Sequence, residues 1–154
     1  HMLNVLRTFP GLPHRCQWTG EINGVHWYND SKGTNVGASC AAIKGLATNR
    51  NLVLIAGGDG KGADFSSLAE IGSAYLRAAV LIGRDGPVIK KVLQNIVPVC
   101  DAGDMNDAVL KAAGIAEPGD VVLLSPACAS FDMFEDYRAR GEAFIAAVNR
   151  LAGR

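Results

Sequence analysis

The chain has 154 residues and a formal net charge of zero, because 15 Lys and Arg residues balance 15 Asp and Glu residues. Hydrophobic residues make up 49% and charged residues 19%, an ordinary balance for one globular domain with a substantial core. The charge balance excludes a basic surface that would recruit nucleic acid or anionic membrane. No apolar stretch approaches the roughly 20 residues of a membrane span. We therefore expect a soluble domain with neither of these partners.

The four cysteines are far apart and form no Cys-x-x-Cys pair, so a zinc site is not predicted. Several have apolar neighbours, as buried free cysteines do, which favours a reduced, cytoplasmic compartment. His14 and His26 stand alone, and we expect no metal site from them.

The first thirteen residues are expected to lie outside the domain proper. His1 and Met2 have the character of a cloning remnant. Residues 3–13 end in Pro10-Gly11-Leu12-Pro13, which is typical of an entry linker.

The next segment predicts a β-hairpin, because Asn23-Gly24 separates two strand-like segments at residues 15–22 and 25–28. Apolar runs that follow predict buried strands, and segments of helical periodicity lie between them. The expected strands are 52–56, 79–82, 96–100 and 121–124. The expected helices are 34–46 capped by Thr34, 67–77 with a Ser67/Glu70 capping box, one that begins near Pro87, 104–115, and 130–151. This alternation predicts a Rossmann-like three-layer α/β domain, with a mostly parallel sheet and an N-terminal β-hairpin.

Three polar segments, at residues 28–35, 57–64 and 125–132, each follow an expected strand. Ligands of open α/β sheets bind where strands end and helices begin, so we expect the three segments to converge on one edge. They are rich in Lys, Ser, Thr and Gly, and such an edge suits an anionic ligand.

The loop at residues 57–62 matches neither a P-loop nor a dinucleotide-binding fingerprint, and its glycines are also explained by a tight turn. Lys61, flanked by glycines, favours a role in binding a carboxylate or phosphate. Thr34 and Ser130 are expected to begin helices, whose free N–H groups attract anions. Arg15 is equally well explained as a surface charge or as a ligand contact. Cys128, between two alanines, is expected to be packed and unreactive.

Four segments taken together resemble the C-terminal domain of the Mur ligases, in particular the D-glutamate-adding branch of that family. They are Leu12–Arg15, Asn29–Asn35, Gly57–Lys61 and Leu124–Ser130. The resemblance covers essentially everything after Gly11, in matching order and spacing. The Asp-Asn-Pro-Arg and His-His-Pro motifs of sister branches do not occur. Residues 14–154 would then be the C-terminal domain, and residues 3–13 a linker from a missing central domain.

The resemblance implies a monomeric, ATP-dependent ligase of cytoplasmic peptidoglycan synthesis, and so of cell-wall growth, cell shape and cell division. It joins D-glutamate to UDP-N-acetylmuramoyl-L-alanine through an acyl phosphate. ATP and Mg²⁺ would be held mainly by the central domain, which is missing here together with the UDP-binding N-terminal domain. We therefore expect the chain on its own to be inactive.

The resemblance also implies how D-glutamate is bound. Lys61 and Thr34 would hold its α-carboxylate. Ser130 and the backbone around Phe131 would hold its γ-carboxylate, with Tyr137 nearby.

Three further residues are implied to act on ATP. Lys32 would be the catalytic residue that faces the transferring phosphoryl group. Arg15 would reach towards phosphate and Asp30 towards the ribose. No metal ligand is expected in this chain.

Two other classes of protein remain open from the residues alone. The first is a stand-alone nucleotide- or amino-acid-binding Rossmann-like module, since this architecture serves many functions. The second is a small Rossmann-like oxidoreductase, which the missing dinucleotide fingerprint disfavours.

Overall fold

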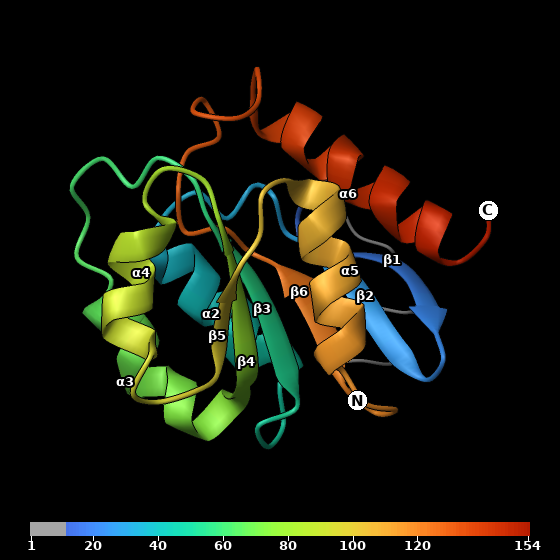
Figure 1. Ribbon diagram of the computed structural model, residues 1–154, viewed down its shortest axis with the longest axis horizontal. Helices are drawn as coiled ribbons and strands as arrows, with labels where there is room; N and C mark the ends of the chain where they lie inside the picture. Colours follow the sequence, from blue (N-terminus) through green and yellow to red (C-terminus); the bar gives the residue numbers. More distant parts are fainter. Residues whose placement is uncertain (1–11) are drawn as a thin grey trace.

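The computed structural model describes residues 12–154, which form a six-stranded sheet with the order β1-β2-β6-β3-β4-β5 (Figure 1). β1 (Gln17–Ile22) and β2 (Val25–Asn29) form an antiparallel hairpin at one edge. The other neighbouring strands are parallel. They are β3 (Leu52–Gly57), β4 (Leu76–Ile82), β5 (Val99–Asp101) and β6 (Val121–Leu124). The predicted linker lies largely outside the described residues.

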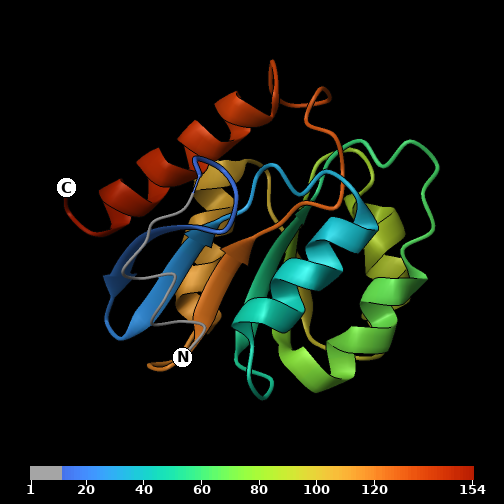
Figure 2. The same ribbon diagram turned by 180° about the vertical axis from the view of Figure 1, so that it is seen from behind.

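Helices cover both faces of the sheet, so the predicted three-layer α/β fold is confirmed. One face carries α2 (Val36–Leu46), α3 (Ser66–Tyr75) and α4 (Gly86–Leu93). The other carries α5 (Met105–Ile115) and α6 (Tyr137–Leu151), in front of the sheet in Figure 1 and behind it in Figure 2. Within the described part of the chain, no helix has the length and apolar character needed to cross a membrane.

The central strands are apolar throughout because successive side chains point to opposite faces, and both faces are covered. In β3, Leu52 and Leu54 pack under α2 and α3, whereas Val53 and Ile55 pack under α5 and α6. All four are fully buried. The hairpin turn is the predicted one, since Asn23 and Gly24 both have positive φ (52° and 80°).

Two predicted helix starts are wrong because an asparagine or aspartate further along the chain caps the helix instead. α2 is capped by Asn35 and not by Thr34: the Asn35 side chain accepts from the Ala38 N–H at 2.9 Å. α6 begins at Tyr137 and not at Ser130, because Asp136 caps it by accepting from the Ala139 N–H at 2.8 Å. Residues 130–136 form turns.

The boundaries around α3 and β5 also differ from those predicted. The expected capping box is absent, since α3 follows Phe65 without a side-chain cap. The helix ends at Tyr75 because β4 begins at the buried Leu76, paired with β3. β5 is shorter than residues 96–100, since a turn still holds Ile96 to Leu93.

We predict opposite effects for two glycine substitutions. Gly57 ends β3 with φ of 125°, and an added Cβ would collide with the Ile82 carbonyl oxygen. Gly57→Ala should therefore lower the free energy of unfolding by about 2 to 5 kcal/mol. An added Cβ at Gly45, inside α2, meets nothing within 4 Å. Gly45→Ala should raise stability by about 0.5 to 1 kcal/mol. Urea unfolding measures both, and equal effects would contradict the strain assigned to Gly57.

Candidate functional site

The three polar loops converge on one edge of the sheet, as predicted. They follow β2, β6 and β3, which are neighbours in the sheet. The Asp30 N–H donates to the Leu124 carbonyl at 2.7 Å, which joins the β2 loop to β6. Asp59 and Ala129 exchange two backbone hydrogen bonds of 2.9 Å, which join the β3 loop to the β6 loop. The β6 loop is therefore fixed from both sides.

The loop after β6 leads to the opposite face of the sheet from the loops after its two neighbours, β2 and β3. After β2 and β3 the chain enters α2 and α3 on one face. After β6 it enters α6 on the other face. The loops thus diverge to opposite sides, which is the usual position of a ligand site in an open α/β sheet.

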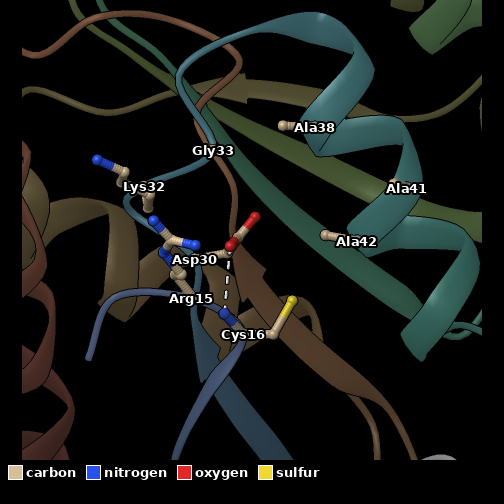
Figure 3. Close-up of a pocket in the computed structure, with 8 residues that line it drawn as sticks. All are labelled: Arg15, Cys16, Asp30, Lys32, Gly33, Ala38, Ala41 and Ala42. Carbon is tan, nitrogen blue, oxygen red and sulfur yellow. Dashed lines mark hydrogen bonds between the residues drawn. The ribbon is translucent and has the colours of Figure 1, made fainter. Parts of the chain in front are cut away.

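A pocket of about 350 Å³ lies beside α2 at this edge (Figure 3). One wall is made of small side chains of α2, and the Cys16 sulfur points towards it. Arg15, Lys32 and Asp30 lie together on the opposite side. The full lining is Arg15, Cys16, Asp30, Lys32, Gly33, Ala38, Ala41 and Ala42. A flat apolar wall opposite two cations suits an anionic ligand with a flat apolar part.

Asp30 is buried beneath this pocket and hydrogen-bonded through both carboxylate oxygens. Oδ1 accepts from the Cys16 N–H at 3.1 Å, and Oδ2 accepts from the Ser125 hydroxyl at 2.7 Å. Burial raises the pKa of Asp30, and the hydrogen bonds from Ser125 and Cys16 oppose that rise. Burial and the nearby Asp30 raise the pKa of the Cys16 thiol to about 12, so this thiol is unreactive.

His14, at the start of the described chain, anchors Arg15 beside the β2 loop. Its Nδ1 accepts from the Asn29 amide at 2.9 Å, which leaves the proton on Nε2, 3.4 Å from a Glu142 carboxylate oxygen. Its carbonyl accepts from the Lys32 N–H at 2.9 Å. The buried His14 thus has a local structural role.

Lys32 and Tyr137 are brought together although 105 positions separate them in the sequence. The Lys32 ammonium lies 4.2 Å from the centroid of the Tyr137 ring, and the Arg138 guanidinium lies 4.9 Å from it. Cations at these distances are attracted by the ring quadrupole. No carboxylate within residues 12–154 forms an ion pair with Lys32.

Lys61 and Phe131 form a second group on the other side of the β6 loop. The Lys61 ammonium lies 6.0 Å from the centroid of the exposed Phe131 ring. Ser130 is buried, and its carbonyl accepts from the N–H groups of Met133 and Phe134, which closes a turn where the sequence predicted a helix start. Thr34 is exposed, just before the α2 cap.

Arg140 is the main residue that the sequence analysis missed. It is 1% exposed and donates to the Ser31 hydroxyl, the Ser31 carbonyl and the Cys128 carbonyl at 2.7 to 2.9 Å. One feature of the sequence could have indicated that Arg140 is buried: it lies four residues before the buried Phe144, on the same face of α6. Cys128 itself is buried as predicted, and burial raises the pKa of its thiol to about 12.

The fold and the loop edge together define a class of protein. It is a Rossmann-like domain in which two loops that contain lysine and glycine, after β2 and β3, meet the polar β6 loop at the switch point of its sheet. Such an edge suits an anionic ligand.

Comparisons with known proteins identify the family. A family model described as "Mur ligase, glutamate ligase domain" matches residues 14–128. The chain is 56% identical to the UDP-N-acetylmuramoylalanine–D-glutamate ligase of Legionella pneumophila, over 98% of this chain and 34% of that protein. It is 58% identical to the ligase of the same name from Methylococcus capsulatus, over 98% of this chain and 32% of that protein. The chain belongs to the Mur ligase family, and it spans about a third of the length of these curated relatives.

Solved structures agree on the fold. A murein peptide ligase of Psychrobacter arcticus matches with a TM-score of 0.63 and 15% identity, covering 97% of this chain and 31% of that one. A MurF ligase of Thermotoga maritima in complex with ADP matches with a TM-score of 0.58 and 17% identity, covering 96% of this chain and 36% of that one.

We predict a pH dependence of stability from Asp30. Because its folded pKa is raised above the ordinary 3.8, folded protein holds this proton more tightly than unfolded chain. The resulting stabilisation is fully present below pH 3.8 and is lost as the pH rises through the folded pKa. Asp30→Asn has no such proton, so its stability relative to wild type should increase with pH in that window.

Urea unfolding across this acidic range gives the measurement, and Asp64→Asn is the matched control. Hydrogen bonds from Ser66 lower the pKa of the exposed Asp64. The contribution of Asp64 to the free energy of unfolding is therefore lost as the pH falls, whereas that of Asp30 is lost as the pH rises. Identical pH profiles for wild type and Asp30→Asn would contradict the effect assigned to burial.

Proposed function

We propose that the chain is the C-terminal, amino-acid-binding domain of an ATP-dependent ligase that adds D-glutamate to UDP-N-acetylmuramoyl-L-alanine in cytoplasmic peptidoglycan synthesis. The observation that carries the proposal is the loop edge at β2, β6 and β3. There, Lys32 and Lys61 present ammonium groups with no ion-pair partner among the described residues. Relatives of more than 50% identity that bear this ligase name support D-glutamate as the amino acid bound at this edge.

D-glutamate is a dicarboxylate, and we propose that two groups at this edge bind its two ends. Lys61 and Thr34 hold the α-carboxylate. The turn at Ser130 and Phe131 holds the γ-carboxylate, beside Tyr137. This turn remains suitable without a helix, since the N–H groups of Phe131 and Asp132 have no acceptor within residues 12–154. Adjacent free N–H groups in a turn form an anion-binding concavity.

ATP is proposed to lie along the pocket beside α2. Arg15 contacts phosphate, and Lys32 faces the transferring phosphoryl group, where its charge stabilises the transition state. Asp30 reaches the ribose. Each oxygen of its carboxylate already accepts one hydrogen bond and has a second lone pair available for a ribose hydroxyl. The ADP bound by the MurF relative supports a nucleotide in this family.

Magnesium does not fit this chain. Residues 12–154 contain no group of three or more His, Cys, Asp or Glu side chains arranged to hold a metal ion. We propose that Mg²⁺ and most ATP contacts belong to a central domain of the same polypeptide, that residues 3–13 link it to the domain at residues 14–154, and that the complete protein is monomeric. The chain's length, about a third of its relatives, supports a multidomain parent.

The proposed reaction has two steps. The L-alanine carboxylate attacks the γ-phosphorus of ATP, which gives an acyl phosphate and ADP. The amine of D-glutamate then attacks the acyl carbon, and the tetrahedral intermediate collapses with loss of phosphate and a proton.

A phosphate-release assay tests the function directly. The complete polypeptide should release phosphate with ATP, Mg²⁺, acceptor and D-glutamate together, and the 154-residue chain alone should release none above background. Turnover by the chain alone would contradict the domain assignment. Full-affinity ligand binding by the chain without turnover in the complete polypeptide would instead favour a stand-alone nucleotide- or amino-acid-binding module.

We predict different kinetic effects for the two site lysines in the complete polypeptide. Lys32→Ala should mainly lower kcat, because an interaction made in the transition state is removed. Lys61→Ala should mainly raise KM for D-glutamate. Each loss should be on the order of 10²-fold if the charges are desolvated in the closed enzyme.

Steady-state kinetics with D-glutamate varied makes the distinction. Lys111→Ala is the control, because that lysine pairs with Asp107 on α5 and should leave both constants unchanged. If Lys32→Ala kept a normal kcat and only weakened D-glutamate binding, Lys32 would act on D-glutamate and not on the phosphoryl group, which would contradict the proposed roles.

A further inference from the structure

We propose that Arg84 is a positioning residue for Lys61 and acts on it through Asp59. Arg84 follows β4, outside the three loops that carry the proposed ligand contacts. The inference rests on the proposed function, in which Lys61 binds a carboxylate of the amino-acid substrate. It adds a fourth loop to the site and assigns that loop an orienting role.

The Lys61 backbone needs external support. Its φ is 52°, in the left-handed region that non-glycine residues rarely adopt. The Asp59 carboxylate supplies one support, because its Oδ1 accepts from the Lys61 N–H at 3.0 Å. The Asp85 carboxylate supplies a second, since its Oδ2 accepts from the Gly60 N–H at 2.7 Å. Strained residues held by their surroundings cluster at functional sites.

Arg84 fixes the orientation of the Asp59 carboxylate. Its Nη2 lies 2.7 Å from Asp59 Oδ2, the oxygen that does not contact Lys61. The carboxylate is thus held at both ends, with the guanidinium on one oxygen and the Lys61 N–H on the other. The hydrogen bond from Arg84 has the larger effect and the one from the Lys61 N–H the smaller, and both lower the pKa of Asp59. The carboxylate therefore stays ionised at neutral pH. The backbone of Asp59 cannot shift to compensate, because it is bonded to Ala129 in both directions.

Arg84 is itself tied to the turn that we propose for the other carboxylate. Its N–H donates to Asp132 Oδ2 at 2.8 Å, and Asp132 lies two residues after Ser130. The same network therefore connects Lys61 with the turn at Ser130 and Phe131. Loss of the Arg84 side chain should leave this turn in place, because the backbone N–H remains, and should release Lys61 alone.

Kinetics of the complete polypeptide test the inference. Arg84→Ala should raise KM for D-glutamate roughly three- to tenfold, the effect of losing a partly exposed charge-assisted contact, with kcat and KM for ATP unchanged. Arg84→Lys, which keeps a cation near Asp59, should restore much of the loss, and Asp59→Asn should reproduce it. Lys90→Ala is the matched control: Lys90 forms a similar exposed ion pair with Asp101, 3.2 Å away near β5, and should change nothing.

A double substitution separates positioning from general structure. In a Lys61→Ala background, Arg84→Ala should add no further rise in KM, because the group it positions is gone. A full additional rise, or an equal change in KM for ATP, would overturn the proposal.

Amide hydrogen exchange of the complete polypeptide distinguishes failure of this inference from failure of the proposed function. Arg84→Ala should speed exchange at the Lys61 N–H relative to Lys90→Ala, whether or not D-glutamate is the substrate. Equal exchange in the two variants would overturn the positioning role. If the wild type showed no D-glutamate-dependent turnover, the proposed function would be overturned. The exchange rate at the Lys61 N–H would still test whether Arg84 positions Lys61.

Discussion

The loop edge depends on one buried cation. Arg140 reaches from α6 to the loops after β2 and β6, and no carboxylate among the described residues pairs with it. Burial lowers its pKa to about 10, so it stays protonated at neutral pH. Its desolvation is offset by carbonyl and hydroxyl dipoles of Ser31 and Cys128. Without it, these buried acceptors would be unsatisfied, at a cost of about 1 to 3 kcal/mol each.

This clamp fixes both halves of the proposed site. Ser31, which accepts from Arg140, donates its own hydroxyl to the Tyr137 carbonyl at 2.7 Å and immediately precedes Lys32. Cys128 lies two residues before Ser130, where the proposed γ-carboxylate turn begins. One guanidinium therefore orders the lysine proposed to act on phosphate and the turn proposed to bind glutamate. This side chain of α6 adds to the backbone hydrogen bonds that already join these loops.

Local patterns predicted the sheet, the hairpin and the three loops, because strand burial, Asn23-Gly24 and strand-end polarity are properties of neighbouring residues. They failed at the start of α6. There, Met133 and Phe134 pack against the core at helix-like positions, and the periodicity extends past the true cap at Asp136. Arg140 was missed for a different reason: one of its acceptors, Ser31, lies 109 positions away. A pattern within one segment does not show such a partner.

We propose that the loops after β2, β3 and β6 form one site for D-glutamate. Chemical-shift mapping of the 154-residue chain with D-glutamate tests it most directly, with L-glutamate as the control ligand. We expect weak binding, because the enclosing surface of the other domains is missing. The perturbed amides should group at Lys61, Thr34 and the turn that begins at Ser130, and should be smaller with L-glutamate. Perturbations centred at the opposite end of the sheet, or identical for both enantiomers, would contradict the account.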